Sequence, residues 1–179
     1  MAKLSPAAQK FVLHWGEMGT RWGINRTVAQ IHALLYITPK PLNAEDLVEA
    51  LGVARSNVST SLRELQGWGL VRVVHVLGDR RDHFETMADV WEMFHVIVDQ
   101  RKRREIDPTL VLLRECLAEA EKSGPSETHL RQRLTAMQEF FTTVDGWYQE
   151  VSRLPTAALM QLMRLGGKLR KFLGLTAKA

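Results

Sequence analysis

The chain has 179 residues, of which 45% are hydrophobic and 25% charged, with a formal net charge of +4, which are proportions of a folded globular protein rather than of a disordered one. Cys116 is the single cysteine, which excludes an intrachain disulfide and a thiolate metal cluster. The longest apolar run, residues 33–37, is far shorter than the ~20 residues of a membrane span, and no signal peptide is recognisable, so the sequence predicts a soluble, cytoplasmic protein.

Two helices are predicted at the start of the chain. Ser5 is placed to cap the first, with Pro6 at its first helical position, and apolar residues then recur every three or four positions. Asn25 is placed to cap the second helix, in which the same apolar spacing recurs. Pro39 and Pro41 end this segment, because proline cannot continue a helix.

A short helix, a turn and a polar helix follow. Asn43 is placed to cap the short helix, with Asp46 at the reciprocal position of a capping box, although an aspartate reaches back less well than a glutamate. The polar helix is predicted over about residues 54–67. Its core-facing side chains are Val58, Leu62 and Leu65.

The opposite face of the polar helix carries short hydrogen-bonding side chains and two arginines. These residues are Arg55, Ser56, Asn57, Ser59, Thr60 and Arg63. A helix face selected only for stability in solvent favours Glu, Lys, Gln and Ala, because Ser, Thr and Asn are poorer helix formers. The face suits base edges and phosphates in a DNA major groove. The alternative is an ordinary solvated face.

A β-hairpin is predicted next, and it is the only β structure that the sequence indicates. β-branched residues predict a strand over residues 70–76, and residues 83–86 form a short return strand, so that a wing spans about residues 70–86. Arg80 and Arg81 lie at its tip, where one suits a DNA minor groove and the other a phosphate. An ordinary exposed turn is the alternative for both.

The hairpin turn also holds four potential metal ligands. They are His75, Asp79, Asp82 and His83. Such groups around a turn are more often hydrogen-bonded parts of a hairpin, and Asp82 is predicted to pair with Arg81 or Arg72. The sequence therefore predicts no metal site and no cofactor.

The rest of the chain is predicted to be helical. A helix begins at Asp89, and Asp107 with Pro108 breaks or kinks it. Ser126 is placed to cap a long helix whose apolar residues alternate spacings of four and three over residues 130–151, a seam typical of helix–helix packing. This seam packs either inside one subunit or across a two-fold axis. A last helix spans about residues 156–172.

In this order the elements make a winged helix-turn-helix, and residues 43–86 resemble that of the MarR superfamily. Its GbsR branch is resembled by LGDRRDHFE at 77–85, DVWEMF at 89–94 and RKRREIDP at 101–108, and by GEMG at 16–19 with Trp22 and Gly23. Ala54 departs from the pattern, because relatives often place a Ser or Thr cap there.

The resemblance implies a mainly α protein with one β-hairpin wing. It assigns residues 1–87 to the N-terminal helices and the DNA-binding domain, and residues 88–179 to a helical region for dimerisation and effector binding. The best-known family members control the synthesis or uptake of osmoprotectants such as glycine betaine. We accordingly predict a homodimeric transcriptional regulator, a repressor, that binds a pseudo-palindromic site on double-stranded DNA and that a small-molecule effector releases.

An enzyme and a winged-helix adaptor protein are the two alternatives to a DNA-binding regulator. No Ser/His/Asp spacing, HExxH helix, P-loop or dinucleotide motif occurs, so no enzyme is predicted. The stronger rival is a winged-helix adaptor whose polar helix face meets a protein in place of DNA. Binding to DNA that weakens as salt rises separates the two, since counterion release accompanies phosphate contacts.

Three further features of the sequence suggest either a functional role or an ordinary structural one. An aromatic cage for a quaternary ammonium ligand would draw on Trp15, Trp22, Trp91, Phe94, Trp147 and Tyr148, but aromatic residues at helical spacing are more often core. Cys116 lies on an apolar stripe and is predicted to be a small buried residue. The last helix is apolar on one side and basic on the other; we expect it to pack on the dimer rather than to bind a membrane stably.

Overall fold

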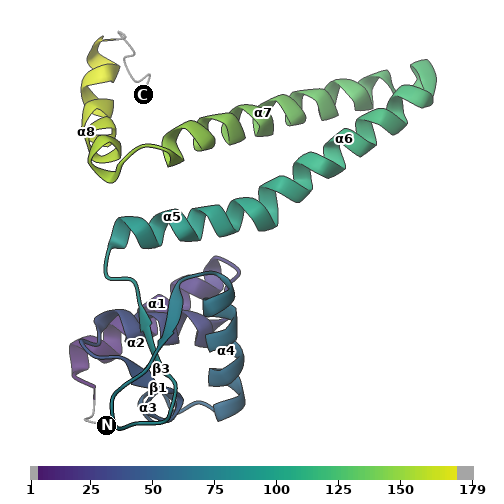
Figure 1. Cartoon of the computed structure of the whole chain (residues 1–179). Helices are drawn as coiled ribbons and strands as arrows, with labels where there is room; N and C mark the ends of the chain where they lie inside the picture. Colours follow the sequence, from purple (N-terminus) through teal and green to yellow (C-terminus); the bar gives the residue numbers. More distant parts are fainter. Residues whose placement is uncertain (1–3, 173–179) are drawn as a thin grey trace. The chain divides into compact units, whose positions relative to one another are not determined.

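The computed structural model describes residues 4–172, with side chains at all of these positions except 125, 126, 163 and 166–172. The chain divides into two compact units between Gln100 and Arg101 (Figure 1). We call the part up to Gln100 the head and the part from Arg101 the helical unit. The predicted functional division at residues 87 and 88 falls just before the last helix of the head, and it stays a prediction.

The first two helices of the head begin where the sequence predicts. Helix α1 (Pro6–Arg21) is capped by Ser5 and helix α2 (Arg26–Ile37) by Asn25, and each capping side chain accepts a backbone N–H from the first turn. Such caps satisfy N–H groups that have no partner inside the helix. Local side-chain chemistry therefore sets both starting points.

Two glycines of α1 let it pack unusually close to α2. A Cβ atom added to Gly19 would lie 2.5 Å from the Cβ of Ala29, and one added to Gly16 would lie 2.6 Å from the Cγ of Gln30. Both distances are far below van der Waals contact, so a Cβ atom at either position would clash with a side chain of α2 unless that side chain or the helix moved.

Asn43 closes the capping box of the third helix and also belongs to a strand that the sequence did not reveal. Its Oδ1 accepts the backbone N–H of Asp46 at 3.0 Å, and its own N–H donates to Oδ2 of Asp46 at 3.1 Å. The aspartate thus completes the box at the start of α3 (Ala44–Leu51). Strand β1 (Leu42–Asn43) comes directly before this helix.

The sheet has three antiparallel strands in the order β1-β3-β2. Strand β2 (Val71–Val74) is shorter than predicted, whereas β3 (His83–Thr86) has the predicted bounds. Phe84 of β3 stands opposite Leu42 of β1 on one side and Val73 of β2 on the other. The hairpin prediction is therefore confirmed but incomplete, because the return strand of the wing also pairs with the segment that precedes α3.

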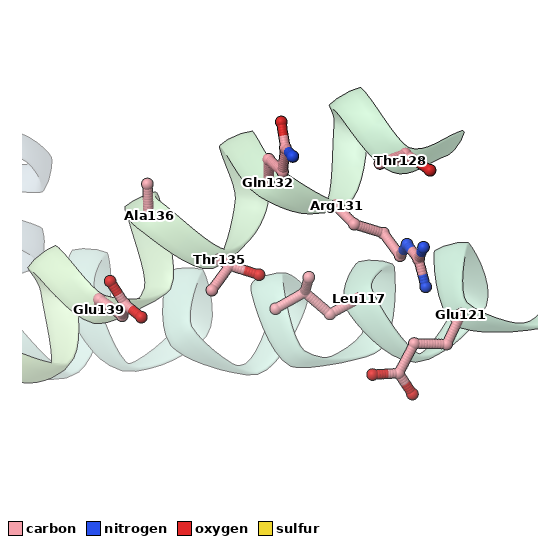
Figure 2. Close-up of a pocket in the computed structure, with 8 residues that line it drawn as sticks. All are labelled: Leu117, Glu121, Thr128, Arg131, Gln132, Thr135, Ala136 and Glu139. Atoms are coloured by element: carbon pink, nitrogen blue, oxygen red, sulfur yellow. The ribbon is translucent and has the colours of Figure 1, made fainter. Parts of the chain in front are cut away.

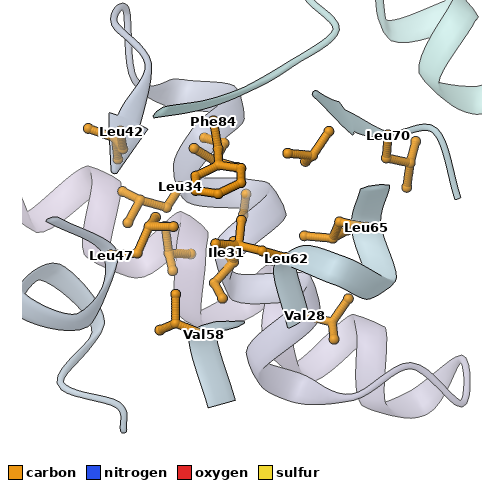
Figure 3. Close-up of a cluster of buried hydrophobic side chains, with 14 of the residues drawn as sticks. Val28, Ile31, Leu34, Leu42, Leu47, Val58, Leu62, Leu65, Leu70 and Phe84 are labelled. Carbon is orange, nitrogen blue, oxygen red and sulfur yellow. The ribbon is translucent and has the colours of Figure 1, made fainter. Parts of the chain in front are cut away.

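Helix α2 lies at the centre of the core of the head. Figure 3 shows Ile31 and Leu34 of this helix among side chains from α3, α4 (Arg55–Gly67) and the sheet. The predicted inner face of α4 is confirmed, since Val58, Leu62 and Leu65 are all buried. Burying one such side chain contributes about 1.5–3 kcal/mol, which holds α4 with its polar face outward.

One polar side chain of this core is His32, which is only 4% exposed. Within the part of the chain that the structure describes, its Nε2 has no hydrogen-bond partner. Burial lowers the pKa of His32 from about 6.5 to about 4, because the charged form is poorly solvated there. The imidazole is therefore neutral at neutral pH.

All but the last residue of helix α5 (Val90–Arg101) belongs to the head; the helix begins one residue after the predicted start at Asp89, whose side chain accepts the backbone N–H groups of Trp91 and Glu92. Met93 of this helix is buried in the core of the head. Residues after the wing therefore contribute to the packing of the head.

Of the two alternatives predicted at Asp107 and Pro108, a break or a kink, the break does not occur, and a π turn interrupts the regular α-helix just before these residues. Helical backbone continues through a π-helix, η1 (Lys102–Ile106), into α6 (Asp107–Lys122). The backbone N–H of Asp107 donates to the carbonyl of Lys102, five residues earlier. A proline inside a regular α-helix removes one hydrogen bond and clashes with the carbonyl four residues before it. The wider π turn accommodates Pro108 without ending the helix.

The helical unit is built on α6 and α7 (Thr128–Ser152), which lie side by side (Figure 1). A 3-10 turn, η2 (Gly124–Glu127), joins them, and α8 (Thr156–Phe172) follows. The residue before α7 is Glu127, whose side chain makes no cap hydrogen bond, and the side chain of Ser126, which was predicted to cap this helix, lies outside the described ones. The bounds predicted for the last helix are confirmed.

A lysine at the π turn connects it to α7. The Nζ of Lys102 lies 2.6 Å from Oδ1 of Asp107 and 3.0 Å from Oδ1 of Asp145. Lys102 and Asp145 are mostly buried, with side chains 18% and 17% exposed. The ammonium of Lys102 donates to the carboxylate of Asp107 and interacts with that of Asp145, and these two partners, Asp107 first, raise the pKa of Lys102. The cluster therefore joins three helical segments through one charge.

Replacing Lys102 by methionine is expected to lower the free energy of unfolding by about 1–3 kcal/mol, because it leaves two carboxylates without their partner. Arg101→Met is the matched control, since the Arg101–Glu105 pair is well exposed and such pairs contribute less than about 1 kcal/mol. Urea unfolding followed by circular dichroism measures both. Equal losses in the two variants would contradict a special role for Lys102.

Candidate nucleic-acid interface

The polar face of α4 is exposed along its length. All six residues predicted there are solvent-accessible, namely Arg55, Ser56, Asn57, Ser59, Thr60 and Arg63. Ala54 precedes the helix and provides no side-chain cap, as its methyl group requires. The helix continues to Gly67, and Gly69 with φ of 75° turns the chain toward β2. The structure thus gathers the six side chains on one helix and leaves them free of core packing.

The tip of the wing presents Arg80 and Arg81 in different ways. The Nε of Arg81 donates to Oδ1 of Asp79 at 2.9 Å, and its backbone N–H donates to the same oxygen at 3.0 Å. The Arg81 guanidinium and this N–H hold the pKa of Asp79 well below its usual range. Arg80 is exposed, and among the described residues no carboxylate pairs with it. Arg81 is therefore held by its own turn, whereas Arg80 is free.

The predicted pairing of Asp82 is wrong. Arg81 pairs with Asp79, and Arg72 pairs across the hairpin with Glu85, whose Oε1 lies 2.7 Å from its Nε. Asp79 is two residues before Arg81 and within the same turn, so its carboxylate reaches the guanidinium and the backbone N–H together. Arg72 pairs with Glu85 rather than with Asp82 because Glu85 lies directly opposite it on the neighbouring strand.

The two arginines on α4 are also unlike each other. Arg55 forms an ion pair with Glu45 of α3. Arg63 has a hydroxyl neighbour, with its Nη2 3.5 Å from Oγ1 of Thr60, and among the side chains that the structure describes no carboxylate forms an ion pair with it. Two of the four predicted arginines therefore have their charge neutralised internally, and two do not.

A hollow of about 360 Å³ brings α3, α4 and the wing together. Three of the predicted arginines line it, Arg55 and Arg63 from α4 and Arg81 from the wing. Ser59, which lies between Arg55 and Arg63 on α4, also lines it. The lining also includes Glu45, Gln66 and Asp82, of which Glu45 and Gln66 were not singled out from the sequence. The first residues of α4 and the wing thus share one polar surface.

The two potential metal ligands that approach each other are Asp79 and His83, with Nε2 of His83 3.5 Å from Oδ2 of Asp79. The Nδ1 of His83 lies 3.0 Å from the carbonyl oxygen of Arg81. Over the described part of the chain, no three His, Cys, Asp or Glu side chains are grouped as metal ligands. These contacts belong to the hydrogen bonding of the turn.

The aromatic residues considered for a cage are spread over both units. Trp15 stacks on Phe11 with ring centroids 5.6 Å apart. Trp22, Phe94 and Trp147 are 49%, 51% and 64% exposed, so the alternative that they are core residues of a single chain is wrong for these three. Each lies open to solvent, so the described contacts enclose no aromatic cage around them.

Cys116 and the last helix, α8, are two further features of the helical unit. Cys116 is half-buried rather than fully buried. Of the apolar side of α8, Leu159 is buried and Leu162 is 44% exposed. The side chains of Met163, Lys168, Leu169, Arg170, Lys171 and Phe172 lie outside the described ones. Among the helices that are described, none has the length and apolar character that a membrane span requires.

A second hollow, of about 460 Å³, lies along α6 and α7. Figure 2 shows Leu117 of α6 facing Thr135 of α7, with Arg131 extending toward α6 near Glu121. Glu139 continues the charged lining. No lining residue of this hollow was predicted to be functional, because nothing in the spacing of the sequence distinguishes these positions from an ordinary helical surface.

A protein family and several known proteins are similar to parts of this chain. The sequence model of the MarR family matches residues 22–82. YvaV of Bacillus subtilis (strain 168), named as an HTH-type transcriptional regulator, is 25% identical over 91 residues, which are 51% of this chain and 51% of YvaV. OpcR of the same organism, named as an HTH-type transcriptional repressor, is 26% identical over 73 residues, 41% of this chain and 40% of OpcR.

This chain therefore spans about half the length of the curated relatives it matches. A crystal structure described as that of a transcriptional regulator has a TM-score of 0.65 and 21% identity, and the match covers 82% of this chain and 96% of that one. At this identity the likeness establishes the fold. Residues 22–82, which include α2, α3, α4 and β2, are thus similar to the MarR family, on a chain that has the fold of a solved transcriptional regulator.

Proposed function

We propose that this protein is a sequence-specific transcriptional regulator that reads double-stranded DNA with α4 and the wing. The observation that carries the proposal is the shared polar surface at the smaller hollow, where arginines from α4 and from the wing lie around one concavity. Duplex DNA offers a major groove for a helix and flanking phosphates for a wing. The names of YvaV and OpcR and the family match at residues 22–82 support the same assignment.

We assign different DNA contacts to different residues of this surface. Thr60 and Arg63 lie in the middle of α4, where side chains reach base edges when a helix enters the major groove. Arg55 is at the start of the helix and beside the wing, a position that suits a backbone phosphate. Arg80 is the wing arginine with an unpaired charge, so we assign it to the minor groove or to the adjacent phosphates.

We further propose that the protein is a homodimeric repressor of the GbsR branch. Support comes from α7, in which no residue is buried although the predicted seam runs along it. Leu130, Met137 and Val144 of this seam are 45%, 51% and 38% exposed in the single chain, which favours the alternative that the seam packs across a two-fold axis. The motif at residues 101–108, as well as the repressor OpcR, supports the branch and the sign of regulation.

A two-fold dimer presents two copies of α4 to one face of the duplex. We therefore propose a pseudo-palindromic operator whose half-sites are about 34–36 Å apart, one helical turn. Sedimentation of the full chain measures the assembly directly. A stable monomer at micromolar concentration would remove the dimer from the proposal. An effector that releases the dimer from DNA belongs to the same proposal.

Selection of genomic fragments on the purified protein, at two salt concentrations, tests DNA binding. Recovery of one pseudo-palindromic site is expected for the wild type, and loss of that site for Thr60→Ala/Arg63→Ala. Each single change is expected to reduce discrimination between operator and random DNA by about 1–3 kcal/mol, because it removes a base contact. Arg80→Ala is expected to weaken both kinds of binding more evenly if this arginine contacts the phosphates, as loss of a phosphate contact does.

The outcomes separate the classes of function. An equal loss on operator and random DNA from Arg63→Ala would assign that residue to phosphate contacts. A wild-type protein whose binding to all DNA is absent at low salt would contradict the proposal and favour the winged-helix adaptor. Neither class includes catalysis, in agreement with the relatives, which are named as regulators.

A further inference from the structure

The ion pair between Glu45 and Arg55 joins the two helices of the helix-turn-helix at the DNA-facing surface. Glu45 is the second residue of α3 and Arg55 is the first residue of α4. The guanidinium of Arg55 donates to Oε1 of Glu45, and the side chains are 67% and 44% exposed. The pair is therefore accessible to an approaching ligand and is not a buried structural bridge.

The surroundings of Glu45 are strongly cationic. It lines the smaller hollow together with Arg55, Arg63 and Arg81. The hydrogen bond from Arg55 is the main cause that lowers the pKa of Glu45, and Arg81 contributes through its charge. The carboxylate of Glu45 therefore lies among the arginines at a position where a phosphate could also bind, and it pairs with Arg55 in place of the phosphate.

We propose that Glu45 is an affinity-setting residue, which neutralises Arg55 in the free protein and gives way to a DNA backbone phosphate when the complex forms. This inference rests on the proposed function, since it concerns the same surface. It assigns to Glu45 a role that opposes binding, whereas every residue predicted from the sequence favours binding. The exchange replaces one anionic partner of Arg55 by another, and the carboxylate returns to solvent.

The exchange has a consequence for the salt dependence of binding. Each phosphate neutralised by a free cation releases condensed counterions and adds about 0.9 to the slope of log K against log salt. An arginine that is already paired with a carboxylate brings no net charge to the phosphate, so its contact adds little to the slope. Removing the charge of Glu45 restores a free cation at Arg55 and makes binding both tighter and more salt-dependent.

Glu45→Gln is expected to tighten binding at low salt by about two- to fivefold, the range that corresponds to breaking one exposed ion pair. The slope is expected to steepen by up to about 0.9. Glu85→Gln is the matched control, because it makes the same change of net charge and also breaks an Arg–Glu pair, that of Arg72, which is not a predicted DNA contact. Glu45→Asp, which keeps the charge, is expected to preserve the wild-type slope.

A double-mutant cycle identifies Arg55 as the partner. In an Arg55→Ala background, Glu45→Gln is expected to leave the slope unchanged, since no guanidinium is released. Equal steepening in Glu45→Gln and Glu85→Gln, or an undiminished effect without Arg55, would overturn the inference and leave only a general effect of charge. Failure of the proposed function is distinguishable, because then the wild type itself shows no salt-dependent binding. Thermal unfolding of each variant verifies that the head stays folded.

Discussion

Gly19→Ala is expected to lower the free energy of unfolding of the head by about 1–3 kcal/mol, the usual cost of overpacking a core. The added Cβ would stand 2.5 Å from the Cβ of Ala29, so α1 must move away from α2. This loss is expected despite the higher helix propensity of alanine, which is favourable by up to about 1 kcal/mol. Urea unfolding followed by circular dichroism measures the change.

Two companion variants test the cause. Ala29→Gly in the Gly19→Ala chain returns the missing space and is expected to restore most of the stability, less about 1 kcal/mol for a glycine within α2. Gly67→Ala, also in the head, adds a Cβ with no atom within 4 Å, and we expect no loss. If Ala29→Gly only adds to the damage, close approach of the two helices is not the reason for glycine at position 19.

Acidification is expected to destabilise the head through His32. Its pKa is about 6.5 in the unfolded chain and about 4 when folded. Between these values the unfolded chain binds a proton that the folded chain does not, so stability is lost as pH falls from 6.5 to 4 and the loss is complete below 4. A shift of this size corresponds to about 3 kcal/mol.

Comparison with His32→Leu isolates this effect from the titration of carboxylates. The free energy of unfolding of the leucine variant is expected to depend less on pH between 6.5 and 4, while the two proteins are expected to respond alike above pH 7. Parallel pH profiles for wild type and variant would show that His32 is protonated without cost. Chemical denaturation at a series of pH values provides both profiles.

Features specified by neighbouring residues could be predicted from the sequence. Ser5, Asn25 and Asn43 each cap the helix that follows, because a short polar side chain needs only the next turn to find its N–H partner. The inner face of α4 follows from the spacing of Val58, Leu62 and Leu65 for the same reason. The exposure of the opposite face is then determined by the geometry of the helix.

Features that depend on distant partners could not be predicted. Strand β1 has two residues and therefore no readable alternation, and it exists because β3 offers it an edge. The π turn before Pro108 is a local feature, but a proline in a helical pattern indicates only a break or a kink and does not reveal which backbone turn accommodates it. In the candidate site, the pairing of Arg55 with Glu45 joins residues ten positions apart on different helices, and no local pattern indicates it.

Asn43 belongs to two elements of the head: it pairs with His83 in the sheet and it caps α3. Its side chain is almost completely buried. Asn43 consequently joins the base of the wing directly to the helix-turn-helix. A surface assembled in this way is preorganised, so little conformational entropy remains to be lost when it binds. The heat-capacity change of binding should accordingly reflect the surface buried, without the large contribution that accompanies folding on association.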